Sequence, residues 1–545
     1  MHLTSATLFS GRLFRIPEYQ RAYAWGSRQR ADLFGDILDI HRSGREHFMA
    51  TVVALARDAR VIGAEKYTAV EIVDGQQRIT TLVILLKAIE KSLVTGSKAH
   101  RDISELLVKD DDRTLLLLQT NHDSSSVFTR YILTGDIAEN ESQTAADRNV
   151  LDAAVECEKF VEDWKVQCDL IELVSIIRNQ LSFVYHEIAD EATVYRVFEV
   201  LNSRGLEVKW IDKLKSQLMA LLFEHIEEGS RSEAVKEMQR VWGDIYRTLG
   251  LDSKLGDDAL KFAGTWAQKT QPNRVSSQED AAVVLTELAG TKLNTIMESG
   301  ERLKLVVGAI KELDENVRLR TVTKIAHARF VATAILLRRF DATTRERLLG
   351  AWERVTFRIF VLAEADTRHK VGEYIRLGYA IFSANLDADE IEKRLFKLGS
   401  DYNLAEKLNQ PNYWNNSYEG WAEPLRYILF RYEEHHAETI GQKLNKSQWN
   451  KIWAEEPSKS IEHIEPQSSG ASYIHHLGNL TMLPPGVNSS LKDKPPVEKA
   501  ERYLTSGLTI TTLVGKNIAA KSAWTEEDIL ARGKDIDAFV RKEWG

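Results

Sequence analysis

The stretch EIVDGQQRITTLVILL, residues 71–86, joins an apolar strand pattern to an apolar helix pattern through a short polar segment. Apolar residues three and four apart from Ile79 onward predict a helix, and the residues up to Asp74 predict a strand. We therefore expect a strand–turn–helix with its turn at Asp74–Arg78. Such a turn directs free backbone N–H groups and a helix N-terminus at one point, an arrangement that favours an anion.

The side chains of this turn agree with an anion site. Arg78 carries a planar guanidinium suited to phosphate, and Gln76 and Gln77 can bind sugar, base or water. Thr80 and Thr81 either cap the helix or approach a metal. A purely structural turn, in which the arginine pairs with the preceding aspartate, is the alternative. The sequence contains no Gly-x-x-x-x-Gly-Lys-Ser/Thr, which excludes an ordinary P-loop ATPase.

The composition is that of a globular protein with two to four domains: 545 residues, 43% apolar and 28% charged. The formal net charge of −8 means that nucleic-acid binding needs a local basic groove.

The N-terminus lacks the apolar core of a signal peptide, and no apolar run reaches the roughly 18 to 20 residues that span a bilayer. We expect a cytoplasmic protein without a membrane partner. Cys157 and Cys168 indicate neither a disulfide framework nor a zinc site.

The chain is predicted to be a multidomain, predominantly helical α+β protein. Residues 1–220 mix a charged helical insert with strands at 47–56, 67–74 and 181–188, and a polar turn is expected at Arg57–Lys66. A helix is predicted at 189–205. Residues 221–445 carry almost only helical stripes. Residues 446–545, with clustered prolines and glycines, predict a small loop-rich module.

The most specific stretch is IEHIEPQSSGASYIHHLGNLTMLPPGVNSS, residues 461–490. Glu462 and His463 are adjacent, and Asn479 and Asn488 follow. Hydrolysis of a phosphodiester needs a base for the attacking water and a cation for the charge on phosphate and leaving oxygen. A neutral imidazole can act as the base at pH 7, and carboxylate and amide oxygens suit Mg²⁺.

These residues resemble the HNH (ββα-metal) nuclease motif, in its version with Asp/Glu-His-Ile-x-Pro, Gly-Asn-Leu and a later asparagine. The resemblance implies that His463 is the general base and that Glu462 and Asn488 hold Mg²⁺ or another divalent metal. It implies that Asn479 braces the loop and orients the imidazole. Glutamate in place of aspartate lengthens one ligand arm by a methylene.

Five further polar residues in this region have less specific expectations. We expect His475 and His476 on a solvated loop rather than at the metal. Lys492, Lys494 and Arg502 either contact phosphate or are solvated.

Three N-terminal motifs resemble one family: RIPEYQRAYAW (15–25), VDGQQRITTL (73–82) and FEVLNSRGLEVKWIDKLK (198–215). They are similar to the GmrS-type half of GmrSD modification-dependent (type IV) restriction enzymes, whose N-terminal domain has a ParB/sulfiredoxin-like fold. The C-terminal motif resembles the GmrD half, so the chain looks like a fused GmrSD.

The resemblance implies that a nucleoside triphosphate, with GTP favoured, is bound and hydrolysed by a site made of Asp74, Gly75, Gln76, Gln77 and Arg78. 

Two other motifs are expected to complete this site. Tyr19, Gln20 and Arg21 would line the same cleft or contact DNA. Asn202 and Arg204 would close the pocket, a helix C-cap being the structural alternative.

These patterns favour an NTP-regulated, divalent-metal-dependent DNA endonuclease, a nickase or double-strand cutter that restricts modified DNA in bacterial anti-phage defence. The alternative is a nucleotide-responsive DNA-binding sensor or adaptor with a non-catalytic HNH module. A third possibility is other phosphate or sulfur chemistry known for ParB-like folds, but the sequence has no suitable cysteine near Asp74. The sequence leaves open which modification and nucleotide are recognised, and whether identical copies assemble.

Overall fold

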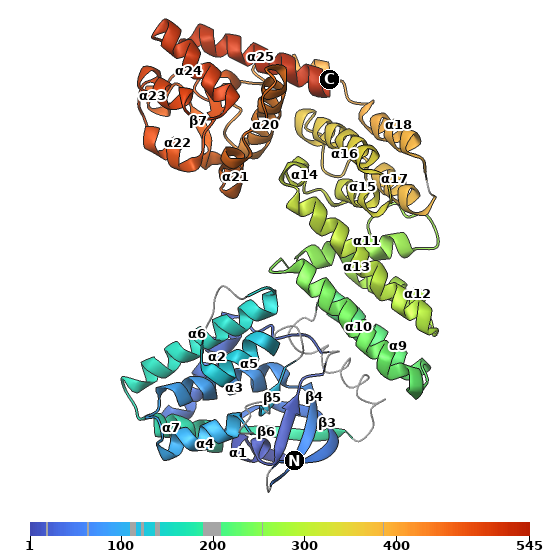
Figure 1. Cartoon of the computed structure of the whole chain (residues 1–545), viewed down its shortest axis with the longest axis vertical. Coiled ribbons are helices and arrows are strands. Elements are labelled where there is room, and N and C mark those ends of the chain that lie inside the picture. The colour runs from blue at the N-terminus through green and yellow to red at the C-terminus, as the bar shows by residue number, and fades with distance from the viewer. Residues whose placement is uncertain are drawn as a thin grey trace. The chain divides into compact units, whose positions relative to one another are not determined.

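The computed structural model describes the chain apart from residues 18–19, 63–64, 110–115, 121–124, 137–141, 189–208, 253 and 385. The chain divides into two compact units, Met1–Gln268 with Ser276–Lys311 and Lys269–Val275 with Glu312–Gly545. Helices dominate both units and a mixed sheet lies in the first (Figure 1), which confirms the predicted α+β class. Among the described helices, none combines the length and apolar character needed to cross a bilayer.

The first unit contains one six-stranded sheet with the order β1-β6-β3-β4-β2-β5. β3 pairs antiparallel with β4 and parallel with β6, and β2 pairs parallel with β4. The strands are β1 (His2–Thr4), β2 (Arg12–Arg15), β3 (His47–Ile62), β4 (Glu65–Asp74), β5 (Leu118–Gln119) and β6 (Leu181–Ile188).

The β3–β4 hairpin is longer than the sequence predicts. Ala59 pairs with Thr68 and Val61 with Lys66, so the polar turn expected at Arg57–Lys66 is mostly strand. A polar sequence is compatible with strand here because side chains at this end face solvent, as the 71% exposure of Val61 shows. The predicted strand at 181–188 is confirmed as β6. The helix predicted at 189–205 lies outside the described residues.

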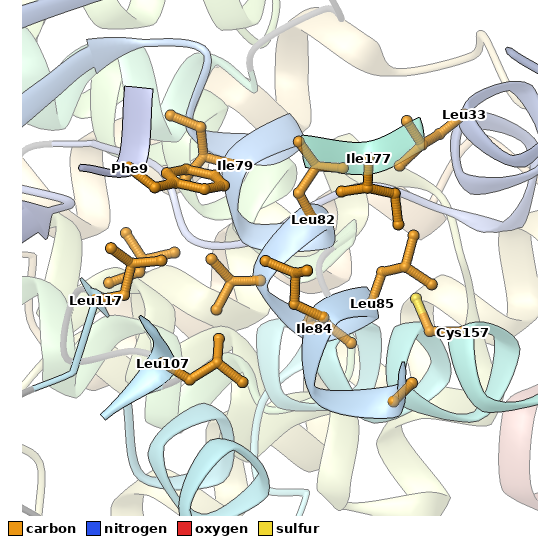
Figure 2. Packing of buried hydrophobic residues seen from close by; sticks show 14 of the residues in the cluster. Phe9, Leu33, Ile79, Leu82, Ile84, Leu85, Leu107, Leu117, Cys157 and Ile177 are labelled. Atoms are coloured by element: carbon orange, nitrogen blue, oxygen red, sulfur yellow. The ribbon is translucent and has the colours of Figure 1, made fainter. Parts of the chain in front are cut away.

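Helix α3 (Gln76–Ser92) forms the centre of the first unit. Every residue of its second and third turns is buried, as expected for a core helix that is apolar all round. Ile79, Leu82, Ile84 and Leu85 lie among buried side chains from several other elements (Figure 2). The strand–turn–helix predicted from residues 71–86 is confirmed, with the helix beginning at Gln76.

The remaining helices confirm the predicted helical character of most of the chain. In the first unit they are α1 (Ser5–Phe9), α2 (Ser27–Ser43), α4 (Lys98–Leu107), α5 (Ser125–Thr134), α6 (Ala145–Lys165), α7 (Leu170–Ser175), α9 (Trp210–His225), α10 (Glu228–Leu249), α11 (Lys254–Ala267) and α12 (Gln278–Ala289). Next come α13 (Leu293–Glu315), α14 (Val317–Val322), α15 (Ala326–Leu337), α16 (Ala342–Phe357), α17 (Val371–Ser383), α18 (Ala388–Gly399), α19 (Leu404–Leu408) and α20 (Ala422–Thr439).

A buried carboxylate joins three helices of the second unit. Glu353 on α16 accepts hydrogen bonds from Arg318 Nε at 2.7 Å and Arg431 Nη1 at 3.0 Å, and from the Tyr427 hydroxyl. The Glu353 side chain is only 2% exposed. A charge at this depth requires such partners, because its desolvation is costly without them.

Residues 446–545 are more helical than predicted, so the expectation of a loop-rich module is wrong in this respect. The elements are α21 (Lys446–Ala454), β7 (Ile461–His463), β8 (Leu480–Met482), α22 (Pro485–Leu491), α23 (Pro496–Leu504), α24 (Thr509–Lys521) and α25 (Glu526–Trp544). The prolines that suggested loops begin helices: Pro485 opens α22 and Pro496 opens α23, where a missing N–H costs nothing.

Two segments that precede residue 446 are hydrogen-bonded to this module. The Glu433 carboxylate on α20 accepts the Thr509 N–H at 2.7 Å and the Ile510 N–H at 2.8 Å, and so caps the N-terminus of α24. In the loop between α19 and α20, the Trp414 carbonyl accepts the Leu477 N–H at 3.0 Å. The Trp414 indole donates to Asp537 Oδ1 at 2.8 Å.

Gly478, immediately before β8, allows α25 to contact the hairpin. A Cβ at this position would lie 1.8 Å from the Ile529 carbonyl oxygen and 2.8 Å from the Gly533 nitrogen. Both atoms belong to the backbone of a long helix, which cannot yield without moving as a whole.

We predict that Gly478→Ala lowers the free energy of unfolding of the second unit by about 1–3 kcal/mol or more, because the added methyl overpacks a rigid contact. Gly486→Ala is the matched control, since a Cβ there meets no atom within 4 Å. Urea unfolding followed by tryptophan fluorescence measures both. Equal stability of the two variants would show that α25 does not pack on Gly478.

Candidate functional site

The stretch 461–490 folds into an antiparallel strand pair followed by a short helix. Glu462 lies opposite Thr481 and His463 opposite Leu480, and α22 follows β8 directly. The long loop between the strands contains Asn479 near its end. This ββα arrangement sets the positions of the side chains described next.

His463 is a buried, neutral imidazole. The Gln467 amide Nε2 lies 3.0 Å from His463 Nδ1 and donates to it. Nδ1 is therefore unprotonated, and the Nε2–H donates to His475 Nδ1 at 3.0 Å. Burial lowers the pKa of His463 to about 3, and the charges of His475 and Lys499 act in the same direction. The ring is thus uncharged at pH 7, the form that can accept a proton.

His475 contacts His463 directly, so the expectation that it lies on a solvated loop is wrong. Its ring stacks on Tyr418 with centroids 5.4 Å apart, and Tyr418 meets His463 edge-on at 4.6 Å. His475 Nε2 lies 3.9 Å from Glu419 Oε1. The neighbouring His476 accepts a backbone N–H at 3.1 Å and is half-buried, which lowers its pKa.

Glu462 leaves β7 on the face opposite His463, because consecutive strand side chains alternate. Its Oε1 accepts from the Tyr503 hydroxyl at 2.7 Å and pairs with Lys499 Nζ at 2.8 Å. Lys499 also donates to the His463 carbonyl at 2.7 Å. Burial raises the pKa of Glu462, and the lysine opposes that shift. The structure therefore does not bring the acid and the imidazole into contact.

Asn488 presents an amide oxygen without a donor. Its Nδ2 donates to the carbonyls of Lys459 at 3.0 Å and Ile461 at 3.2 Å. Its Oδ1 is shielded from solvent and has no hydrogen-bond partner among the described residues. Such an orphaned oxygen calls for an explanation. Amide and carboxylate oxygens, such as this one and Oε2 of Glu462, are the donor types that suit a hard cation such as Mg²⁺.

Asn479 braces the loop between the strands. Its Oδ1 accepts the Glu465 N–H at 2.8 Å, and its Nδ2 donates to the carbonyls of Glu465 and Ile474 at 3.0 and 2.9 Å. The ring of His463 is held by other residues, Gln467 and His475. Asn479 thus acts on the imidazole only through the shape of the loop.

Sequence reasoning missed Lys499, the buried cation of this site. The cations that it singled out, Lys492, Lys494 and Arg502, are all exposed. Lys499 and Tyr503 are four residues apart and so share one face of α23, the signal that could have linked them.

The turn predicted to bind an anion lines a pocket of about 530 Å³ in the first unit. Asp74–Arg78 contribute to its wall together with Gln20 and Arg21. Tyr19, Asn202 and Arg204, which were expected at the same site, lie outside the described residues.

Gly75 allows the tight turn before α3 and leaves the first-turn N–H groups of that helix without a side-chain cap. Its φ is +94°, and a Cβ would lie 3.1 Å from Val52 Cγ2 and 3.2 Å from the Thr51 carbonyl oxygen. As the N-cap of α3 it offers no side chain to the first-turn N–H groups. Those donors are therefore available to a ligand.

The pocket contains both cations and acids. Burial lowers the pKa of Arg21 and raises that of Asp74, and the Coulomb attraction between them opposes both shifts. Arg78 is exposed, with its guanidinium 5.7 Å from the centre of the Trp25 ring. Asp32 and Asp36 of α2 also line the pocket. Two guanidiniums and three carboxylates lining one pocket suit an anion accompanied by a divalent cation.

The adjacent glutamines of the turn have different roles. Gln77 Oε1 accepts the N–H groups of Ala24 and Trp25 at 2.7 and 3.2 Å, and its Nε2 donates to the Ala22 carbonyl at 3.2 Å. These bonds hold the segment 22–25 beside the pocket, so both ends of the Gln77 amide already have partners within the protein. Gln76 is 6% exposed, and its Oε1 has no donor among the described residues.

Thr80 and Thr81 neither cap α3 nor approach the pocket. Their hydroxyls donate to the carbonyls of Gln76 and Gln77, four residues earlier in the same helix.

Two family models match the chain, one at each site. The model described as GmrSD restriction endonuclease, N-terminal domain, matches residues 5–219 and includes the pocket. The model described as GmrSD restriction endonucleases, C-terminal domain, matches residues 400–538 and includes the ββα module. The resemblance to GmrSD restriction endonucleases expected from the motifs is confirmed. A search of curated proteins gives no match.

We predict that the two glutamine substitutions change the stability of the first unit by different amounts. Gln77→Ala should lower the free energy of unfolding of the first unit by about 2–4 kcal/mol, because it leaves loop N–H groups unpaired. Gln76→Ala should change it by less than about 1 kcal/mol, because the oxygen that it removes has no protein donor. Urea titrations of both variants measure the difference. A larger loss for Gln76→Ala would contradict the assignment.

Proposed function

The chain belongs to the GmrSD family of restriction endonucleases, and from this premise we propose that its C-terminal module cuts DNA by HNH-type, metal-dependent hydrolysis. We propose further that a nucleoside triphosphate, GTP in the first place, binds and is hydrolysed in the pocket of the first unit and regulates cutting. Family membership makes the protein a DNA endonuclease of a restriction system. Modified phage DNA in the bacterial cytoplasm is the substrate in this proposal.

The observation that carries the nuclease proposal is the neutral imidazole of His463 in a ββα unit that also presents the unpartnered Oδ1 of Asn488. The Gln467 side chain is exposed and so is easily displaced. A water taking its place donates to Nδ1, which accepts the proton as the water attacks phosphorus. The ring is held in position throughout by the hydrogen bond from its Nε2–H to His475.

Glu462 and Asn488 would hold the divalent cation. Lys499 and Tyr503 fix Oε1 of the glutamate, which leaves Oε2 as the ligand atom. The cation would neutralise charge on the scissile phosphate and on the leaving oxygen.

The pocket of the first unit supports the nucleotide proposal by its chemistry. Arg21 and Arg78 would contact phosphate oxygens near the open N-terminus of α3. Asp32, Asp36 and Asp74 would accommodate the accompanying cation. The orphaned Gln76 Oε1 would accept from a hydroxyl or amino group of the sugar or base.

One observation favours a second function, a regulated DNA-binding protein whose ββα module does not cut. Glu462 already has a buried cation, Lys499, as its partner. In this second function the ion pair has a structural role and holds α23 against β7. Cutting assays decide between the two functions.

We predict that His463→Ala and Asn488→Ala lower Mg²⁺-dependent nicking by about 10²–10⁴-fold. Differently modified plasmids with magnesium, ATP or GTP provide the assay, and nicked and linear DNA are scored on gels. His369→Ala, an exposed histidine of the same unit, is the control and should cut normally. Cutting by His463→Ala at the normal rate would refute the base assignment. A wild-type protein that binds but never cuts would establish the second function.

We predict that Arg78→Ala and Gln76→Ala weaken nucleotide binding by at least about tenfold, since each removes a charged or polar ligand contact. Arg28→Ala is the matched control, an exposed arginine of α2 that does not line the pocket. Fluorescent GTP and ATP analogues measure affinity, and phosphate release measures turnover. Unchanged binding and turnover in both pocket variants would exclude this nucleotide site without affecting the nuclease assignment.

A further inference from the structure

A histidine, a cysteine and a glutamate meet at the end of α2, in the first unit. His41 Nδ1 lies 2.8 Å from Glu172 Oε1, and Cys168 Sγ lies 3.5 Å from His41 Nε2. One ligand atom from each residue lies within 4.8 Å of the other two. The cysteine and histidine are 127 residues apart in the chain, so their spacing in the sequence gives no sign of this cluster.

Rigid packing holds the two segments together. α2 lies along α6 through an Arg30–Glu156 ion pair, with Nη2 2.7 Å from Oε1, and through Phe34 stacked on Phe160 at 4.5 Å. His41 belongs to the last turn of α2.

The other two residues flank the start of α7. Cys168 immediately precedes Asp169, the N-cap of α7, and Glu172 lies in the first turn of that helix. Trp164 at the end of α6 meets the His41 ring edge-on at 4.9 Å and shields one side of it.

The hydrogen bond from His41 to Glu172 leaves the lone pair of His41 on Nε2. Because Glu172 accepts from His41 Nδ1–H, the Nε2 lone pair faces the Cys168 sulfur. Metal-binding histidines are commonly oriented by a carboxylate in this way. Tetrahedral zinc, with a Zn–N length of about 2.1 Å and a Zn–S length of about 2.3 Å, separates the two donor atoms by about 3.6 Å. The observed 3.5 Å matches that separation.

We propose that His41, Cys168 and Glu172 form a site for a zinc-class divalent ion, distinct from the Mg²⁺-type donors of the ββα module. Sulfur and imidazole nitrogen select a soft or borderline ion over Mg²⁺. His41 Nε2 and Cys168 Sγ are the primary ligands. The carboxylate of Glu172, which is bonded to Nδ1, orients the ring, and solvent completes the shell.

The ion would connect α2 to the α6–α7 corner. Asp32 and Asp36 of α2 line the nucleotide pocket, while His41 lies in the last turn of the same helix. Binding would therefore hold in place a helix that forms one wall of that pocket.

The chain offers a matched control, because it contains only two cysteines. Cys157 is fully buried in the core, and burial raises the pKa of its thiol. Cys157→Ser removes a thiol without touching the proposed site. Cys168→Ser, His41→Ala and Glu172→Gln each remove one member of it.

The test titrates Co²⁺ into the metal-free full chain and follows the near-ultraviolet thiolate-to-cobalt absorption, which carboxylate and amide ligands cannot produce. We expect one saturating equivalent that Zn²⁺ displaces. The band should be lost in Cys168→Ser and retained in Cys157→Ser. Affinity should fall at least tenfold in His41→Ala and about 10–100-fold in Glu172→Gln, as for second-shell carboxylates. Thermal melts of each variant without metal confirm that it is folded.

Alkylation with iodoacetamide provides the second readout. Zn²⁺ should slow modification of Cys168 at least tenfold, with mass spectrometry identifying the modified cysteine. Absence of the band in the folded wild-type chain would overturn the proposal. So would rapid alkylation of Cys168 that Zn²⁺ does not slow, which would identify a thiol activated by His41 without a metal.

Discussion

A buried ammonium group determines the geometry of the C-terminal module. Lys499 is 1% exposed, and its Nζ is shared by the Glu462 carboxylate and the carbonyls of His463 and Ile464. A cation at this depth is tolerated only with several acceptors. The same contacts fix the end of β7, so the acid is held against α23 while the imidazole is turned to the opposite side, toward the loop.

Each of the two motifs uses its amide side chains in two ways. Gln77 and Asn479 form hydrogen bonds through both ends of the amide, and all of these bonds go to loop backbone. Gln76 and Asn488 each keep an oxygen that no described residue satisfies. Gln77 and Asn479 fix the conformation of the loops, whereas the free oxygens of Gln76 and Asn488 are available to a ligand. A buried acceptor without a donor, in the same motif as an amide that is hydrogen-bonded at both ends, is the pattern expected where a ligand supplies the missing donor.

Local patterns in the sequence predicted many of the elements but few of the contacts between them. The strand–turn–helix at 71–86 follows from periodicity, and the family follows from ordered motifs. The β3–β4 turn was misplaced because polar strand residues on an exposed face look like a loop. His475 was assigned to solvent because nothing in its spacing reveals Tyr418 on a distant loop. Lys499 and the meeting of His41 with Cys168 depend on tertiary packing, which single-sequence spacing does not encode.

The capping of α24 by Glu433 bears on how small an active fragment can be. The Thr509 and Ile510 amides receive their acceptor from α20, and the loop that carries His475 is tied to Trp414. A polypeptide that starts at residue 446 would therefore leave the N–H groups of Thr509 and Ile510 without their acceptor. It would also lack the hydrogen bond that holds the loop between β7 and β8. Truncated proteins should therefore begin upstream of Trp414, and moving the β7–β8 hairpin into another scaffold would require the preceding segment as well.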